Sequence, residues 1–366
     1  MLKLSQRNFG LDMLRAVSIW LVLCQHIKFS IIDGLEGLKI GGVGVEVFFV
    51  LSGFLIGQIL IRNLQRENSF KSIANFWIRR WFRILPLYYL MLLVKFLFID
   101  DSVGSNILYY VLFLQNNFYG IDFYEVTWSL VIEEWFYITI PIFLFVAFKL
   151  SRKRVKTVVA LFALFILFEN IIRFIYVSKY NIPYSGVNGN VIFRLDSLFW
   201  GVLLAYVKVN FQYIYAKLSK VPVFIVAVLC FMGYIGFIKV LSGTSIGVDG
   251  YIIPRTIGFS VFPMIIAFML PFVDSKSSFS QHTFFRKSFY YFITYTSLFT
   301  YAIYLVHPLV FESVLNDNSF GIGAGISFIL AVVITYGIAS ILFKFYEGPF
   351  LKIRDKYFPD RKAIKK

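Results

Sequence analysis

The sequence predicts an all-α, polytopic membrane protein of about ten transmembrane helices with both termini in the cytoplasm. Three observations support this. The 366 residues are 59% hydrophobic and 20% aromatic, with a mean hydropathy of +0.75, which is too apolar for a soluble domain of this length. Apolar stretches of spanning length recur along the chain, and the basic residues alternate between its loops.

The apolar stretches are near or above the roughly 20 residues that a helix needs to cross a bilayer. They predict spans at residues 13–31, 43–61, 84–99, 128–148, 157–177, 192–207, 221–240, 252–272, 292–312 and 323–343. Residues 107–118 are apolar but too short, so we expect an interfacial or re-entrant segment there. Within the second stretch, Gly53 and Gly57 form a small-xxx-small pair that allows helices to approach closely.

The Lys and Arg residues fix the orientation of these spans. Every second loop and both ends of the chain are basic, and together these segments carry 27 of the 36 Lys and Arg residues, whereas the intervening loops carry only Lys39 and Lys179. The positive-inside rule then places both termini in the cytoplasm and requires an even number of spans. The net charge of +16 is thus explained by topology and contact with membrane lipid, and no nucleic-acid partner is expected.

We expect one transmembrane domain over residues 1–351, followed by a short basic tail over residues 352–366. The N-terminal segment resembles a signal peptide but lacks a small-residue cleavage pattern, so an uncleaved first span is favoured. Cys24 and Cys230 lie within predicted spans, which argues against a disulfide framework. No Cys/His cluster has the spacing of metal ligands, and no metal is predicted.

The ionisable residues of the first span include Arg15 and His26, both within its apolar run. Such side chains cost roughly 2.5–3.5 kcal/mol in a bilayer core and therefore indicate a functional site that faces a bundle interior or a cavity. Eleven residues of helix separate them by about 16 Å, with Arg15 near the cytoplasmic face. A histidine can act as a general base near neutral pH, although a lone histidine on an apolar helix is more often a packing residue.

Further polar residues are predicted at the outer level of His26. They come from three other spans. One contains Glu133, which is next to Glu134, a second contains Arg194 and Asp196, and a third contains His307. A carboxylate beside an imidazole would fix its tautomer and stabilise its protonated form, which favours a catalytic site. The alternative is a structural network of ion pairs that holds the helices together.

A second group of candidates lies at the cytoplasmic end of the third span, in the segment FWIRRWFRILP. Arg79, Arg80 and Arg83 are spaced three and four residues apart, so we expect their guanidinium groups to share a helix face. Arginine suits bidentate recognition of phosphate. These arginines, with Arg15 at a similar depth, therefore indicate a phosphate-bearing ligand, although each alone could be an anchor for lipid headgroups.

Taken in order, seven segments resemble the acyltransferase 3 family of integral membrane O-acyltransferases. They are LDMLRAVSIWLVLCQH, GVGVEVFFVLSGFLI, RRWFR, TWSLVIEEWFY, RLDSLFWGVLLA, YAIYLVHP and YEGP, and they extend from Leu11 to Pro349. The resemblance implies transfer of an acyl group, usually acetyl from acetyl-CoA, to a hydroxyl of a carbohydrate or related acceptor. The location implied is the cell inner membrane.

The resemblance also implies roles for residues that match the family's motifs. Arg15 and His26 match its essential Arg and His, Arg80 and Arg83 match the pair proposed to engage the donor, and Glu133 matches its acidic residue. We expect acyl-CoA to be the donor, bound through its phosphates by Arg79, Arg80 and Arg83. His26 would deprotonate the acceptor or carry the acyl group briefly, oriented by Glu133 first or by Asp196. Arg194, Asp196, Tyr304 and His307 are acceptor-binding or supporting candidates.

Many members of that family carry a fused hydrolase-like domain outside the membrane, and we expect none in this chain. The membrane domain then completes the transfer to a glycan or lipid-linked glycan itself, or a separate extracytoplasmic transferase does. A competing interpretation is a proton-coupled carrier that uses His26, Glu133 and His307 as a proton relay. Such carriers often show internal repeats, and none is evident. A weaker interpretation is a catalytically silent scaffold for glycan assembly.

Overall fold

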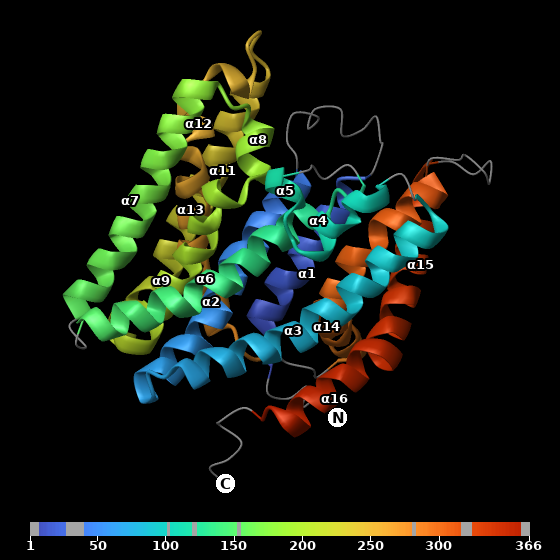
Figure 1. Ribbon diagram of the computed structural model, residues 1–366, viewed down its shortest axis with the longest axis horizontal. Coiled ribbons are helices and arrows are strands. Elements are labelled where there is room, and N and C mark those ends of the chain that lie inside the picture. Colours follow the sequence, from blue (N-terminus) through green and yellow to red (C-terminus); the bar gives the residue numbers. More distant parts are fainter. Residues whose placement is uncertain are drawn as a thin grey trace. The chain divides into compact units, whose positions relative to one another are not determined.

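The computed structural model describes residues 7–26, 40–100, 103–118, 123–151, 155–279, 283–315 and 324–359. Across these ranges all regular secondary structure is helical (Figure 1). Eight helices in the described ranges are long and apolar enough to cross a membrane, which confirms the all-α polytopic fold. They are α2 (Ile40–Arg66), α3 (Phe70–Phe98), α6 (Thr127–Ser151), α7 (Val155–Tyr180), α11 (Val221–Ser242), α13 (Gly258–Ser275), α14 (Phe284–Leu315), and α15 (Ala324–Leu342) with its continuation.

Two of the ten predicted spans are represented by shorter helices. Helix α1 (Phe9–Cys24) and helix α9 (Leu195–Asn210) have 16 residues each, fewer than the roughly 20 of a full span. The end of the first predicted span, residues 27–31, lies outside the described residues. Helix α9 is short because a 3₁₀ turn, η4 (Val191–Phe193), precedes it.

The prediction of one continuous span over residues 252–272 was wrong. The segment divides into a single turn, α12 (Ile252–Arg255), and helix α13, which begins at Gly258. At the break, the carbonyl oxygen of Thr256 accepts a hydrogen bond from Arg173 at 2.7 Å, and that of Gly258 accepts one from the Tyr234 hydroxyl at 3.1 Å. Arg173 thus supplies a side-chain donor to a carbonyl at the break, where the chain does not continue as a helix.

Residues 107–118 form the short helices α4 (Ile107–Val111) and α5 (Gln115–Phe118). Neither is long enough to cross a membrane, as predicted. The segment packs on its neighbours through hydrogen bonds: the Tyr88 hydroxyl donates to the Tyr110 carbonyl at 2.8 Å, and Trp135 donates to the Phe113 carbonyl at 3.0 Å. Both cysteines are free, as expected for residues within spans.

The chain divides into two compact units. Unit 1 comprises residues 1–25, 30–66 and 143–298, and unit 2 comprises residues 26–29, 67–142 and 299–366. Within unit 1, helices α2 and α9 pack backbone to backbone. A Cβ atom at Gly53 would lie 2.0 Å from the Leu198 carbonyl oxygen, and one at Gly201 would lie 2.1 Å from that of Val50. Only glycine permits this approach, and Gly57 likewise faces Val202 and Ala205 of α9.

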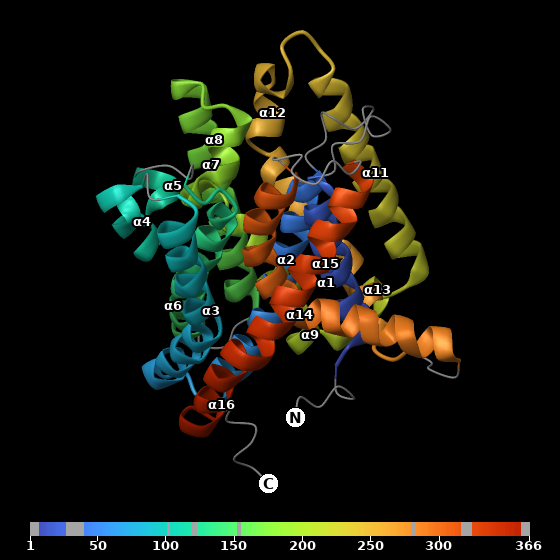
Figure 2. The ribbon, with the colours of Figure 1, turned by 90° about the vertical axis from the view of Figure 1, so that its right-hand side faces the viewer.

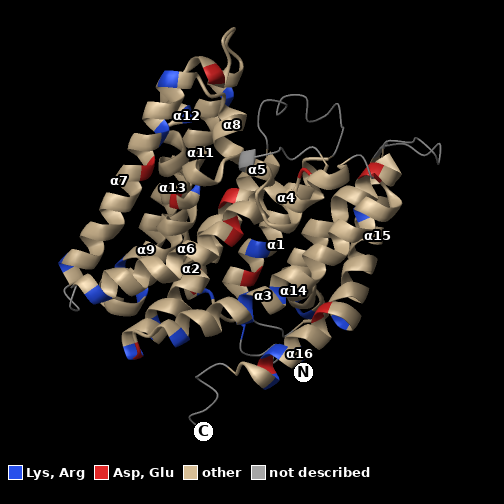
Figure 3. Cartoon of the chain, viewed as in Figure 1, with Lys and Arg blue, Asp and Glu red and all other residues tan. Residues whose placement is uncertain are grey.

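Unit 2 contains α3, the first part of α6, the second part of α14, and α15. Helix α15 continues through a π-helical turn, η6 (Phe343–Glu347), into α16 (Gly348–Tyr357) (Figure 2). Trp77 of α3 donates to the Tyr137 carbonyl of α6 at 2.8 Å, and the Tyr301 hydroxyl of α14 donates to the Ile84 carbonyl of α3 at 2.9 Å. Charged residues are sparse along the long helices (Figure 3).

Candidate functional site

Two histidines meet in unit 2. His26 lies in the turn after α1 and His307 lies on α14, and the centroids of their rings are 5.3 Å apart with planes inclined by 67°. The Phe311 ring packs against both, at 5.3 Å from His26 and 6.0 Å from His307. His307 is completely buried and His26 is partly exposed. The structure thus brings together the two histidines that the sequence placed at the same level.

The surroundings of His307 indicate its tautomer. Its Nδ1 lies 3.1 Å from the Ile303 carbonyl oxygen one helical turn earlier, and a carbonyl can only accept. We therefore assign the proton to Nδ1, which leaves a lone pair on Nε2 in the neutral ring. Among the described residues no group hydrogen-bonds to this buried Nε2. It is available to accept a proton or a hydroxyl hydrogen bond.

The carboxylate whose charge acts on His26 is Glu125, an exposed residue just before α6. Sequence reasoning missed it because it precedes the predicted span, although only Val126 separates it from the TWSL motif. Nearby, the Tyr304 hydroxyl lies 2.7 Å from the Ser129 Oγ and donates to the Val126 carbonyl at 2.9 Å. Tyr304 therefore joins α14 to the start of α6, one turn before His307.

Glu133 is connected to Arg80 through a tyrosine. The Tyr137 hydroxyl donates to Glu133 Oε2 at 2.8 Å and also accepts a hydrogen bond from Arg80 Nη2. The Arg80 guanidinium lies 4.1 Å above the centroid of the Tyr137 ring, a cation–π contact. Tyr137 is almost completely buried and was not predicted, although it lies one helical turn after Glu133. The described bonds thus join Glu133 to the arginine group.

The three arginines of α3 make contacts with different parts of unit 2. Arg79 reaches α16, where it donates to the Phe358 carbonyl and lies 3.3 Å from Asp355 Oδ1. Arg80 turns toward α6, as described above. Arg83 is exposed, and its charge acts on Glu347 of the π-helical turn. The expected shared helix face is therefore divided between two neighbouring helices and the surface.

Contacts within unit 2 place the arginine group and the histidines at different levels. Tyr137 of α6 is at the level of Arg80, and Ser129, two turns earlier, is at the level of Tyr304. His307 follows Tyr304 by a further turn. The rise from Tyr137 to Ser129 along α6 is added to the rise from Tyr304 to His307 along α14. At 1.5 Å per residue, the sum separates Arg80 from the histidine pair by about 16 Å.

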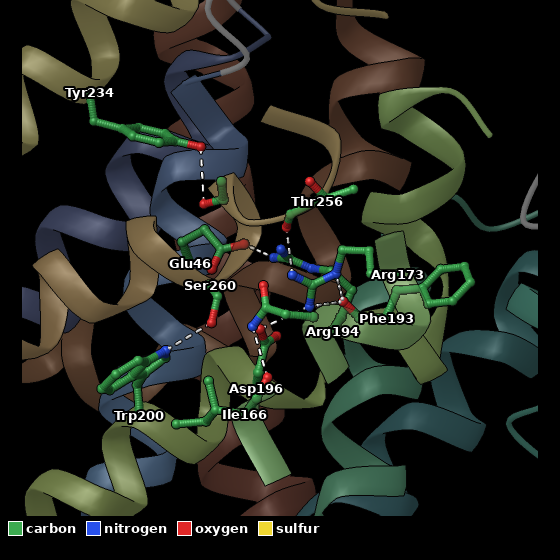
Figure 4. A network of polar contacts seen from close by, with 12 residues as sticks. Glu46, Ile166, Arg173, Phe193, Arg194, Asp196, Trp200, Tyr234, Thr256 and Ser260 are labelled. Atoms are coloured by element: carbon green, nitrogen blue, oxygen red, sulfur yellow. Dashed lines mark hydrogen bonds and ion pairs between the residues drawn. The ribbon is translucent and has the colours of Figure 1, made fainter. Parts of the chain in front are cut away.

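The remaining candidates belong to unit 1. Arg15 lies on α1 and is partly exposed. Arg194 forms an ion pair with Glu46 and lies 4.5 Å from the centroid of the Phe259 ring. Asp196 accepts a hydrogen bond from Arg173 at 2.8 Å (Figure 4). Arg194 and Asp196 are completely buried, and their contacts are those of a buried ion-pair network. Among the described residues, no group of three or more His, Cys, Asp or Glu side chains could hold a metal ion.

Comparison with protein families identifies the chain. The model of an acyltransferase domain, Acyl_transf_3, matches residues 8–344. The chain belongs to the acyltransferase 3 family. This membership and the apolar helices make it a multi-pass membrane protein, and the family agrees with the resemblance of the seven motifs.

Several bacterial proteins are similar to the chain. A Staphylococcus aureus (strain COL) protein named "Putative O-acetyltransferase" is 27% identical over 94% of this chain and 57% of its own length. Listeria monocytogenes peptidoglycan O-acetyltransferase OatA is 32% identical over 38% of this chain and 24% of its own length. The chain thus spans little more than half the length of the Staphylococcus aureus relative, although that relative matches nearly the whole chain. No solved structure matches the chain.

Proposed function

We propose that the protein is a membrane O-acyltransferase, which moves an acetyl group from acetyl-CoA to a hydroxyl of a cell-envelope carbohydrate at the inner membrane. Membership of the acyltransferase 3 family and the names of the relatives support the reaction class. The main structural support is the arrangement of unit 2, where an arginine group and a pair of imidazoles lie about 16 Å apart along the helices. Polar side chains of α6 and α14 lie between these two ends.

The arginine end suits the donor. Coenzyme A carries several phosphates, and a guanidinium is the side chain best shaped to bind them in pairs of hydrogen bonds. Arg83 is exposed and can meet such a ligand directly, with Arg79 beside it at the surface end of α3. Arg80 points inward to Tyr137 and Glu133. In this proposal it forms the inner limit of the phosphate site, from which the pantetheine arm extends toward the histidines.

The imidazole end suits the chemistry. His26 takes the proton of the acceptor hydroxyl as the oxygen attacks the thioester carbonyl carbon, the carbon–sulfur bond breaks, and the sulfur leaves as a thiolate that is then protonated. His307 offers Nε2 as a second acceptor beside it. The carboxylate of Glu125 stabilises the imidazolium that forms on His26. Arg15 is proposed as a further essential residue on the evidence of its motif.

The acceptor is proposed to be a glycan such as O-antigen, capsule or exopolysaccharide, or a lipid-linked precursor. One relative is named for the O-acetylation of peptidoglycan, which is also a carbohydrate. A separate extracytoplasmic transferase that receives the acetyl group and passes it to the glycan is a further proposed partner.

The test is transfer of label from radiolabelled acetyl-CoA to crude envelope glycan by the purified protein in liposomes, with release of free CoA thiol measured in parallel. The wild type is compared with His26→Ala, and His282→Ala serves as a control that removes a histidine elsewhere. We expect transfer by the wild type and the control but not by His26→Ala. Equal transfer by all three proteins would refute the role of His26, and transport of an unmodified substrate without transfer would favour the carrier.

A further inference from the structure

Unit 1 contains a cluster of five charged side chains: Glu46 of α2, Glu169 and Arg173 of α7, Arg194 directly before α9, and Asp196 in the first turn of α9. Figure 4 shows four of them, Glu46, Arg173, Arg194 and Asp196. Each of these residues is more than nine-tenths buried. The cluster has three carboxyl groups but only two guanidinium groups. The proposed transfer chemistry uses no residue of this cluster.

The two guanidinium groups are each paired with one of the carboxylates. Arg194 pairs with Glu46, and Arg173 lies 2.8 Å from Asp196 Oδ2. Arg173 also donates to the Phe193 carbonyl at 2.7 and 3.1 Å and to the Thr256 carbonyl at 2.7 Å. Its donors are therefore committed to Asp196 and to the backbone at two helix breaks.

Glu169 is the carboxyl group that remains. No ion pair within 4 Å reaches it in the described part of the chain, and its Oε2 is buried without a hydrogen-bond partner. It lies in the middle third of α7, the helix whose membrane-spanning stretch has few buried residues. Its electrostatic neighbours are Asp196 and Arg173. An ionised Glu169 would thus give the cluster one unbalanced negative charge at membrane depth, which is strongly unfavourable.

A proton removes this imbalance and satisfies a second group. Asp196 Oδ1 is also buried without a hydrogen-bond partner among the described residues. Two ionised carboxylates can only accept hydrogen bonds, so neither can satisfy the other. A protonated carboxyl is a donor, and the charge-assisted bond from a carboxylic acid to a carboxylate is among the stronger hydrogen bonds in proteins.

We propose that Glu169 carries a proton at neutral pH and shares it with Asp196, so that unit 1 contains a membrane-buried proton-binding site. The other charged and titratable groups around the cluster are Arg173, Arg194, Glu46 and the hydroxyl of Tyr234, which donates to the Gly258 carbonyl. Both arginines are paired with the other two carboxylates. The site is independent of the proposed acyl transfer, because it depends only on the charge balance of unit 1.

The first test is infrared difference spectroscopy of the purified protein in lipid at neutral pH. Glu169→Gln should remove a carbonyl band of a protonated carboxyl. Glu67→Gln is the control, since it replaces the same residue type at an exposed position outside the cluster and leaves the charge balance of the cluster unchanged. It should leave that band and remove a carboxylate band instead. The proposal is overturned when Glu169→Gln loses a carboxylate band and keeps the protonated one.

The second test uses only the wild-type protein and so does not depend on the folding of a variant. A hydrophobic carbodiimide, dicyclohexylcarbodiimide, reacts with protonated carboxyl groups in apolar surroundings and leaves a stable adduct that peptide mass spectrometry locates. We expect modification at Glu169 to exceed that at Glu67, an exposed glutamate, by at least tenfold. Modification at Glu169 that is no greater than at Glu67 would show that Glu169 is ionised.

Discussion

Replacing Tyr137 by phenylalanine tests the link between the arginine end and the acidic residue of the candidate site. The substitution removes one hydroxyl, which accepts from Arg80 and donates to Glu133, and keeps the ring beneath the guanidinium. Hydrogen bonds to charged groups contribute about 1.5–3 kcal/mol. At about 1.4 kcal/mol for each factor of ten, we expect kcat/KM for acyl-CoA to fall by about 10- to 100-fold.

A second substitution at the same position separates the ring from the hydroxyl. Tyr137→Leu also removes the cation–π contact, in which the guanidinium lies 4.1 Å from the ring centroid. Such contacts contribute roughly 0.5–2 kcal/mol, so kcat/KM should fall by a further factor of roughly 2 to 30. The order expected is therefore wild type, then phenylalanine, then leucine.

The assay is the initial rate of acetyl transfer in liposomes over a range of acyl-CoA concentrations. Tyr206→Phe is the control, because its ring packs against Phe162 in unit 1 and the substitution keeps that packing. Activity equal to the wild type in both Tyr137 variants, with both proteins folded, would show that Arg80 and Glu133 work without this link and would refute the reasoning.

Three further substitutions test the donor site, the histidine pair and the packing of α2 on α9. Arg83→Ala should raise the KM for acyl-CoA about tenfold with little change in kcat, because an exposed charge-assisted contact to phosphate contributes roughly 1.5 kcal/mol. A lowered kcat at constant KM would contradict the assignment of Arg83 to donor binding. His307→Ala should lower kcat about 100-fold if Nε2 takes part in proton transfer, as steady-state kinetics would show, and it should leave donor binding intact. Gly53→Ala should lower the thermal unfolding midpoint and the folded yield, because its Cβ would lie 2.0 Å from the Leu198 carbonyl oxygen. Such overpacking typically costs 1–3 kcal/mol. Gly233→Ala is the control and should be neutral, because the space around Gly233 is open.

The sequence predicted the helices better than it predicted the contacts. Hydropathy predicted the ends of α2, α7 and α11 to within a few residues, because a helix buried in lipid requires a continuous apolar run. It failed at residues 256–257, where the helix is broken and Arg173 of α7 donates to the Thr256 carbonyl. A hydropathy profile has no information about such partners.

The same distinction holds for the candidate site. The depths of His26 and His307 followed from helix rise, and the structure brings the two rings together. Spacing along α3 could not show that Arg79 turns to α16 while Arg80 turns to α6, because neighbouring residues on a helix point about 100° apart and their partners lie on helices distant in the sequence. Glu125 and Tyr137 were missed for the same reason, since their roles come from tertiary contacts.

The hydrogen bonds of Arg173 also constrain how the membrane protein is assembled. All its partners, Asp196 and the carbonyls of Phe193 and Thr256, are synthesised after α7. Helix α7 therefore enters the bilayer with a guanidinium that has none of its final partners, at a cost of roughly 2.5–3.5 kcal/mol on insertion scales. During that interval the nearest partner is Glu169, one turn earlier on the same helix. The pairing of these two residues in the nascent helix, and its later exchange for the pairing with Asp196, would give α7 a route into the membrane before its neighbours exist.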